Sequence, residues 1–170
     1  MEARAVKWWG WGWEDRTLPV ESRPALWRHL QERLELDPAI VRKVVPIDEI
    51  LPPPCLVSPD EISQLRRIVG EENVSGDDYD RVTHAVGKGY KDLVRLRTGR
   101  IERAPDVVVF PEDEDSVRRL LEFARRRVYA VVPFGGGTGV VGGTETPDGF
   151  AATIALDLRR LRSVLNVDDQ

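Results

Sequence analysis

The sequence is poor in the residues that form disulfides and metal centres. Its only cysteine is Cys55, and its two histidines, His29 and His84, lie far apart in the chain. A single cysteine excludes an internal disulfide, and two separated histidines lack the ligand spacing of a zinc site. A lone histidine such as His84 is more often structural or exposed than a proton carrier. This composition predicts a protein of a reducing, cytoplasmic compartment.

Long apolar runs and an excess of positive charge are missing as well. No run approaches the ~20 apolar residues of a membrane span. Residues 1–16 alternate tryptophan with glycine and charged residues, unlike a signal peptide. The chain has 170 residues, 41% hydrophobic and 32% charged, with a formal net charge of −4. These values predict a soluble globular domain that does not span a membrane and has no affinity for nucleic acid.

Glycine, in contrast, is concentrated in residues 135–143, directly after the apolar, β-prone run 128–132. The glycine loop therefore follows the carboxyl end of a predicted strand. Backbone without side chains turns with positive φ and lets its N–H groups approach an anion closely, and a threonine hydroxyl adds one more donor. We therefore predict a pyrophosphate cradle formed by Pro133, Phe134, Gly135, Gly136, Gly137, Thr138, Gly139, Val140, Gly142 and Gly143.

Two better-known phosphate loops match this stretch less well. Residues 137–142 fit G-x-G-x-x-G, and Asp157 follows at a suitable distance, but a dinucleotide fold needs a helix to start inside the motif. Residues 142–149 contain Pro147 and several glycines and cannot form a helix interior. No G-K-[ST] is present for a P-loop. An ordinary glycine-rich hairpin loop is the remaining alternative.

The order of elements around the loop is typical of one family. Residues 105–111 predict a buried strand that ends in proline, followed by an acidic helix start at 112–115 and an amphipathic helix. A strand at 129–133, the loop at 134–143 and a strand at 153–157 complete the order. Over residues 105–168 the chain resembles the FAD-binding domain of the PCMH-type flavoproteins, the vanillyl-alcohol-oxidase superfamily. The run 87–100 and the tryptophan-rich start are similar to its alkylglycerone-phosphate synthase-like subgroup, which includes bacterial FAD-linked oxidases.

The resemblance implies an α/β (α+β) fold, the N-terminal half of a PCMH-type FAD-binding domain with a parallel β-α-β unit. Residues 1–104 would form a tryptophan-rich arm and helical region, and residues 105–170 the first part of the FAD-binding domain. FAD is the implied cofactor, and because the loop contains no histidine or cysteine, it should bind non-covalently. The chain resembles the N-terminal portion of a longer enzyme. Catalytic residues are therefore expected outside it, and the 170 residues alone are expected to be inactive.

Two reactions and one non-enzymatic role stay open. The subgroup implies flavin-dependent exchange of an acyl for an alkyl group on dihydroxyacetone phosphate, with a small-molecule or lipid-like substrate. The wider family implies oxidation of a 2-hydroxy acid or an alcohol. From another class, the chain would be an inactive interaction module, or would form a homodimer, because aromatic clusters anchor interfaces. Packing across the chain's own fold is the simpler expectation for Trp8, Trp9, Trp11 and Trp13.

Apolar periodicity and capping signals predict several helices before residue 105. A helix at 59–69 starts at a capping box of Ser58 and Glu61 and stops at Gly70. Shorter helices are expected at 77–84 and 90–97, and a proline-rich connector at 37–57. Arg97 and Arg100 are expected to form surface ion pairs rather than to bind a phosphate. A first helix at 22–36 carries one apolar stripe formed by Leu26, Trp27, Leu30 and Leu34.

From residue 105 the pattern becomes β-α-β. The unbroken apolar run 107–110 predicts a strand buried on both faces, parallel to the strand at 129–132. Four carboxylates at 112–115 suit the positive end of the following helix. Further strands are expected at 152–158 and at 161–167. The buried stripe of the helix is expected to consist of Val117, Leu120, Leu121 and Ala124.

Overall fold

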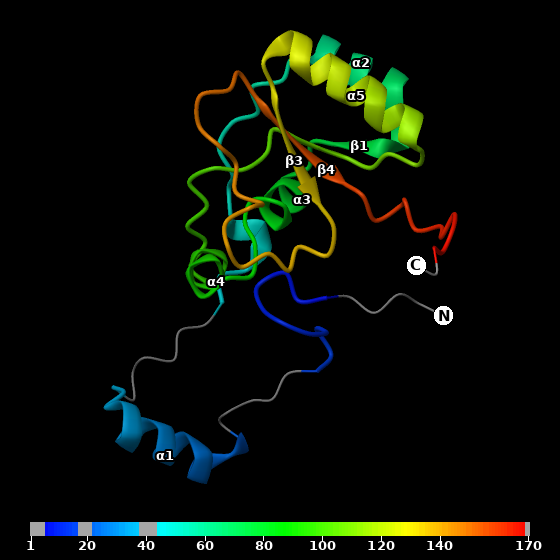
Figure 1. Cartoon of the computed structure of the whole chain (residues 1–170). Coiled ribbons are helices and arrows are strands. Elements are labelled where there is room, and N and C mark those ends of the chain that lie inside the picture. The colour runs from blue at the N-terminus through cyan, green and yellow to red at the C-terminus, as the bar shows by residue number, and fades with distance from the viewer. Residues whose placement is uncertain (1–5, 17–21, 38–43, 169–170) are drawn as a thin grey trace.

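The computed structural model describes residues 6–16, 22–37 and 44–168, and its centre is a four-stranded sheet (Figure 1). The strands are ordered β1 (Val74–Ser75), β2 (Val107–Val109), β4 (Thr153–Asp157) and β3 (Ala130–Phe134). The last three run parallel, whereas β1 is antiparallel to β2. The predicted α/β class with a parallel β-α-β unit is confirmed. β4 lies between β2 and β3, the two strands that helix α5 (Glu114–Arg127) connects.

Burial explains why β2 and β4 lie in the middle of the sheet. Val107, Val108 and Val109 are fully buried, as expected for a strand covered on both faces, and every residue of β4 is buried. β3 lies at the edge of the sheet and contains Pro133, whose ring nitrogen has no hydrogen to donate. An edge strand tolerates proline because one side of its backbone has no neighbour to receive that hydrogen.

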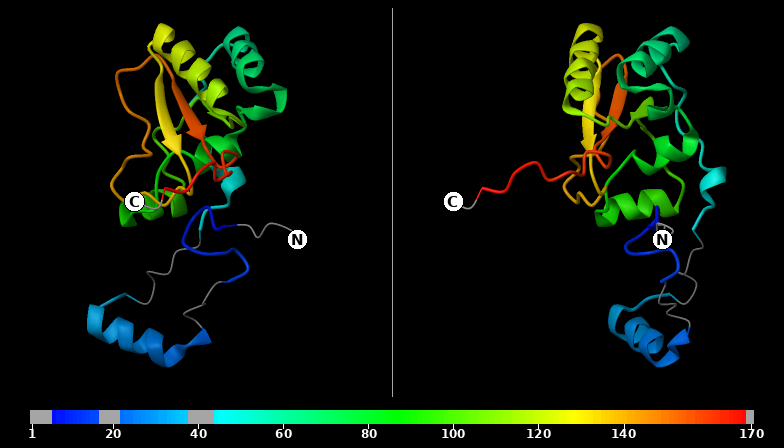
Figure 2. Two further views of the ribbon diagram at one scale, coloured as in Figure 1. Left: turned by 45° about the vertical axis from the view of Figure 1, so that its right-hand side comes forward. Right: turned by 90° about the vertical axis from the view of Figure 1, so that its right-hand side faces the viewer.

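Helices α2 (Pro59–Val69) and α5 pack on each other and on the sheet (Figure 2). The predicted start and stop of α2 are confirmed. Ser58 and Glu61 form both halves of a capping box, and the helix ends at Gly70, which has φ 104°. The 3-10 turn η4 (Glu71–Asn73) then leads into β1. The core at this interface is formed by Val57, Leu65, Val69, Val74, Val107, Val109, Leu120, Phe123, Ala124, Ala152, Ile154 and Leu156.

The buried stripe of α5 differs from the prediction at one position. Leu121 is 48% exposed, whereas Phe123 is 2% exposed and belongs to the core. Successive helical residues are rotated by about 100°, so Phe123 lies on the same face as Leu120 and Leu121 points away from it. Leu121 and Phe123 are both apolar and both lie within about 100° of Leu120, so the packing of the helix on the rest of the chain decides which of them is buried.

A second core lies at the carboxyl end of the parallel strands, among η3 (Ile47–Glu49), α3 (Asp78–Thr83) and α4 (Tyr90–Arg97). The short helices expected at 77–84 and 90–97 are confirmed. Figures 1 and 2 show that the β3–β4 loop, α4 and the N-terminal arm gather at this end of the molecule. The cluster consists of Ile50, Val82, Ala85, Val86, Leu96, Ile101 and Ala104.

Helix α1 (Pro24–Leu34) forms within the predicted range but buries none of its residues. Leu26 and Leu34, at the two ends of the expected stripe, are 45% and 61% exposed. The periodicity thus predicted the helix correctly, while its expected burial is wrong for the described part of the chain. None of the described helices is long and apolar enough to cross a membrane.

The strand expected at 161–167 does not form. Residues 161–168 have no regular structure, and Val164 and Leu165 are 81% and 92% exposed. A strand needs a neighbouring strand to receive its hydrogen bonds, and the described residues provide none at this place.

The tryptophan arm, residues 6–16, packs partly on the rest of the chain. A bridge between Val6 and Trp13 folds it back on itself. Trp8 packs against the second core, and the ring of Trp9 lies 5.0 Å from the guanidinium of Arg97. Packing on the chain's own fold is therefore confirmed for these two tryptophans, whereas Trp11 remains 53% exposed.

Candidate cofactor-binding site

The glycine loop leaves the carboxyl end of β3 and returns directly into β4. No helix begins between these strands in the structure, which confirms that the G-x-G-x-x-G letters do not form a dinucleotide motif. The loop turns at Gly142, whose carbonyl accepts from the N–H of Glu145 at 3.1 Å. Ligands of parallel sheets bind at the carboxyl ends of the strands, which is where this loop lies.

The backbone donors of the loop are free. Within the described part of the chain, no N–H group of residues 135–144 donates to a protein acceptor. The loop is not hydrogen-bonded to itself as a tight hairpin would be, apart from the single turn at Gly142. A row of unused N–H groups without side chains is the arrangement that binds phosphate oxygens in other anion sites.

The packing of the chain does not require glycine at positions 135, 136 and 143. A Cβ on Gly135 or Gly143 would meet nothing within 4 Å, and one on Gly136 only the Thr138 methyl group at 3.7 Å. None of the three has positive φ. The chain itself would accept side chains at these positions, so their absence leaves room for a molecule that approaches the backbone. The bare surface and the free donors fit a pyrophosphate.

Gly137 differs from these three. It has φ 64°, and a Cβ there would lie 2.6 Å from Cζ of Phe134. Gly137 therefore rests on the Phe134 ring, and glycine is required by the fold at this position. Of the other predicted loop residues, Pro133, Thr138 and Val140 are exposed, Gly139 and Gly142 are half-buried, and Phe134 is buried.

The segment Gly87–Lys88–Gly89 packs against the loop at Gly139 and Val140. The backbone N–H of Lys88 donates to the Gly139 carbonyl at 2.7 Å. A Cβ on Gly87 would overlap the same carbonyl oxygen, and one on Gly89 would lie 3.1 Å from the Val140 carbonyl. Two glycines around Lys88 thus allow backbone to pack on backbone. The sequence marked this segment only through the resemblance of residues 87–100 to one subgroup, not as a support of the loop.

Lys88 also ties the tryptophan arm to this place. Its Nζ donates to the carbonyls of Lys7 at 2.9 Å and Trp8 at 2.7 Å. Burial lowers the pKa of Lys88, because the ammonium group has lost part of its water. Farther along, Arg95 bridges Asp92 of α4 and Glu145 at the end of the loop, at 3.4 and 3.1 Å.

The two arginines weighed as phosphate ligands lie elsewhere. The guanidinium of Arg97 covers the ring of Trp9 rather than pairing with a carboxylate. Arg100 lines a surface pocket of about 620 Å³ beside Tyr90 and Val94 of α4. In the described part of the chain neither forms a hydrogen bond or an ion pair with the glycine loop, so the site consists mainly of backbone groups.

Below the loop, His84 forms a buried pair with Asp157. His84 Nε2 lies 2.9 Å from Asp157 Oδ2, and their side chains are 3% and 0% exposed. Arg159 also contacts this carboxylate, with Nε 2.6 Å from Oδ2 and its backbone N–H donating to Oδ1 at 2.9 Å. Burial raises the pKa of Asp157, but the hydrogen bonds from His84 and Arg159 outweigh burial and hold it below its ordinary value. Sequence reasoning did not connect these residues.

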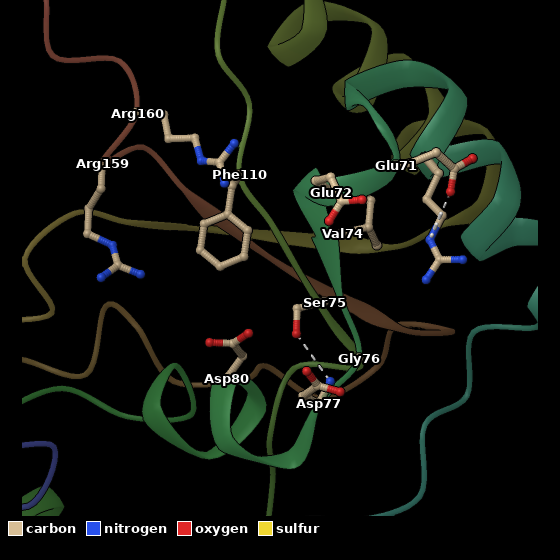
Figure 3. A pocket seen from close by; sticks show the side chains of 11 residues that line it. Glu71, Glu72, Val74, Ser75, Gly76, Asp77, Asp80, Phe110, Arg159 and Arg160 are labelled. Atoms are coloured by element: carbon tan, nitrogen blue, oxygen red, sulfur yellow. Dashed lines mark hydrogen bonds and ion pairs between the residues drawn. The ribbon is translucent and has the colours of Figure 1, made fainter.

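A larger pocket of about 730 Å³ opens beside β1 (Figure 3). Phe110 lies in its wall, with the guanidinium groups of Arg159 and Arg160 at 5.8 and 5.7 Å from its ring. Most charges around it already have partners: Arg66 pairs with Glu71 at 3.7 Å, and Arg160 with Glu112 at 2.6 Å. The described residues include no group of three or more His, Cys, Asp or Glu side chains that could hold a metal ion.

Comparisons with known proteins agree with this geometry. Residues 105–170 match the family model described as an FAD binding domain. The chain is 34% identical over 187 residues to an alkyldihydroxyacetonephosphate synthase of Trypanosoma brucei brucei, covering 97% of the chain and 30% of that protein. A solved alkyldihydroxyacetonephosphate synthase is similar with a TM-score of 0.79 and 27% identity, covering 96% of this chain and 34% of the other. The chain thus spans about a third of the length of these relatives.

Two further relatives share a smaller part of the chain. Protein Rv2250A of Mycobacterium tuberculosis is 35% identical over 112 residues, which are 62% of this chain and 69% of that protein. A mitochondrial D-lactate dehydrogenase [cytochrome] of Arabidopsis thaliana is 33% identical over 108 residues, 64% of this chain and 18% of that enzyme.

Proposed function

The chain belongs to the PCMH-type flavoproteins that share the FAD-binding domain, and from that premise we propose that its glycine loop binds the pyrophosphate of FAD. The observation that carries this proposal is the row of unused N–H groups at residues 135–144, next to three glycines that the fold itself does not require. Bound FAD would supply the flavin chemistry. The residues of this chain would bind and orient it.

Non-covalent binding is part of the proposal. The loop contains no cysteine or histidine: Cys55 is an exposed residue of the proline-rich connector, and the nitrogens of His84 face the Asp80 carbonyl and the Asp157 carboxylate. Backbone N–H groups would hold the phosphate oxygens, with the Thr138 hydroxyl as a further donor. Each hydrogen bond to a charged group is worth about 1.5–3 kcal/mol, so several of them must act together.

We further propose that the chain divides into residues 1–104, a supporting arm and helical region, and residues 105–170, the first part of the FAD-binding domain. In the first region, Lys88 would fix the loop at Gly139 and Arg95 would fix it at Glu145. The ammonium group of Lys88 would also hold the arm at the Trp8 carbonyl. The exposed side chain of Trp11 is a candidate contact of a homodimer.

For the protein that contains this chain, we propose alkyldihydroxyacetonephosphate synthase activity. A fatty alcohol would replace the acyl chain of acylated dihydroxyacetone phosphate, a fatty acid would leave, and no net oxidation would occur. The support is the extent of similarity: the trypanosomal synthase matches 97% of the chain, including the arm and residues 87–100. A role in ether-lipid synthesis and a cytoplasmic location complete the proposal.

The alternative is oxidation of a 2-hydroxy acid, which similarity to the D-lactate dehydrogenase supports. That similarity covers 64% of the chain, against 97% for the trypanosomal synthase, so the extent of the match favours the synthase.

The experiment uses the full flavoprotein that contains this chain. Purified protein is expected to be yellow and to release its flavin into the supernatant on denaturation. It is then given labelled hexadecanol with acylated dihydroxyacetone phosphate, and separately D-lactate or glycolate with an electron-accepting dye. Label in the ether product without dye reduction supports the synthase, and dye reduction alone supports the dehydrogenase. A colourless protein that takes up no added FAD would overturn the cofactor proposal and would favour the alternative that the chain is an inactive interaction module.

A further inference from the structure

His84 lies below the glycine loop with both ring nitrogens engaged. Nδ1 is 2.7 Å from the carbonyl oxygen of Asp80, and Nε2 is 2.9 Å from Oδ2 of Asp157. The hydroxyl of Thr83 is 3.2 Å from Nδ1, and it lies 3.1 Å from the Asp80 carbonyl, to which it donates its own proton. The oxygen of Thr83 therefore faces the ring as an acceptor.

All three neighbours thus require hydrogens from the ring. A backbone carbonyl can only accept, and so can an ionised carboxylate. Asp157 is kept ionised by Arg159, whose guanidinium and backbone N–H both donate to it, at 2.6 and 2.9 Å. A neutral imidazole would place a nitrogen lone pair against either the carbonyl or the carboxylate. Hydrogens on both ring nitrogens would satisfy both of these acceptors.

The ring also contacts the ends of all three parallel strands. Its centroid is 4.2 Å from that of Phe134, the last residue of β3, and 6.2 Å from that of Phe110, which follows β2. Its hydrogen bond to Asp157 reaches the last residue of β4, which is paired in register with Phe134. Gly137 packs directly against the Phe134 ring, near Cζ. A cation against an aromatic ring adds attraction that a neutral ring lacks.

We propose that His84, as an imidazolium, is a positioning residue of the cofactor loop, because it fixes the Phe134 ring on which Gly137 rests. This inference rests on the proposed function, since it gives the loop its ligand. The charged groups around the ring are the Asp157 carboxylate, the Arg159 guanidinium and the Asp80 side chain at the pocket wall. The cation of His84 and that of Arg159 face one buried anion, which leaves positive charge close to a loop that is to hold a pyrophosphate.

The protonation state of the native ring is tested first. Nitrogen-15 NMR of the native flavoprotein, labelled at histidine, distinguishes a ring with two N–H groups from either neutral tautomer. The His84 signals are assigned by their loss in His84→Gln, or in His84→Arg if the Gln variant does not fold. Two protonated nitrogens at neutral pH are expected. A neutral tautomer would overturn the inference.

The positioning role is tested by FAD titration of the apoprotein. His84→Gln keeps one donor but loses the charge, and we expect its dissociation constant for FAD to rise about tenfold, equivalent to about 1.4 kcal/mol. His84→Arg keeps a planar cation with several donors and should stay within about threefold of the native protein. His29→Gln, on the exposed surface of α1, is the matched control and should change nothing.

The outcomes separate the two proposals. Native protein that fails to bind FAD overturns the proposed function and this inference with it. Native binding together with equal affinity in His84→Gln overturns this inference alone. A loss shared equally by the Gln and Arg variants would mean that shape, not charge, matters, and would overturn it too. If His84→Gln does not fold, the Arg variant and the NMR signature of the native ring decide.

Discussion

A valine at position 136 separates what the glycine loop does for a ligand from what it does for the fold. In the structure a Cβ at Gly136 meets only the Thr138 methyl group at 3.7 Å, and the residue does not have positive φ. Gly136→Val should therefore leave folding almost unchanged. If a pyrophosphate lies against this backbone, however, the branched side chain occupies its place. Losing one hydrogen bond to a charged oxygen costs about 1.5–3 kcal/mol.

That free energy corresponds to a loss of FAD affinity between about tenfold and a hundredfold. The assay is a fluorescence titration of apoprotein with FAD, accompanied by a melting curve of the apoprotein. Gly76→Val is the matched control, because Gly76 also lacks positive φ and has nothing within 4 Å of its Cβ, yet lies in another loop. Reduced affinity with unchanged melting is expected for position 136 and no change for position 76. Native affinity in Gly136→Val would refute the assignment of the loop as the pyrophosphate site.

Three other variants test the supports of the site. Gly137→Val should lower both the FAD affinity and the free energy of unfolding, the latter by about 1–3 kcal/mol, because φ 64° and the Phe134 ring exclude a side chain. Chemical denaturation measures the free energy of unfolding, and an unaltered value would contradict this prediction. Lys88→Met should release the carbonyls of Lys7 and Trp8, so limited proteolysis should remove the arm faster than in Lys91→Met. Hydrogen bonds from Ser58, then Tyr129 and Arg127, lower the pKa of Glu61 from 4.5 to about 2, so Glu61→Gln should cost about 2 kcal/mol at pH 7. A group with a lowered pKa stabilises the fold above its unfolded value, so this difference in unfolding free energy should persist above pH 4.5 and vanish toward pH 2; a difference independent of pH would refute it.

Local signals in the sequence predicted the elements well. The Ser58 capping box, the stop at Gly70 and the buried valines of β2 each depend on neighbours within a few residues, which a sequence displays directly. The glycine loop was recognised because a loop between two strands with so few side chains has few other uses. Its placement at the carboxyl end of β3 followed from the same reasoning.

The parts that could not be predicted depend on residues far apart in the chain. His84 and Asp157 are separated by 73 positions, and nothing local marks either of them as a partner of the other. The insertion of β4 between β2 and β3 is likewise a matter of sheet order, which hydrophobic patterns do not encode. The strand wrongly expected at 161–167 has the opposite cause: the segment contains strand-forming apolar residues, but no neighbouring strand is present in the described residues. The prediction for Leu121 is wrong because helical spacing allows both Leu121 and Phe123 beside Leu120, and only the packing of distant elements selects Phe123.

The bond from Lys88 to the carbonyls of Lys7 and Trp8 has a consequence for the protein while it is being made. The side chain of Lys88 binds the carbonyl of Trp8, which lies 80 positions earlier in the chain. Its backbone N–H binds the carbonyl of Gly139, which is synthesised later still. At ~5–20 residues per second, the tryptophan arm leaves the ribosome on the order of ten seconds before the loop exists. During that time its indole rings lack the surface on which Trp8 and Trp9 finally pack. The arm is therefore a segment of the nascent chain that chaperones would be expected to bind before the loop is made.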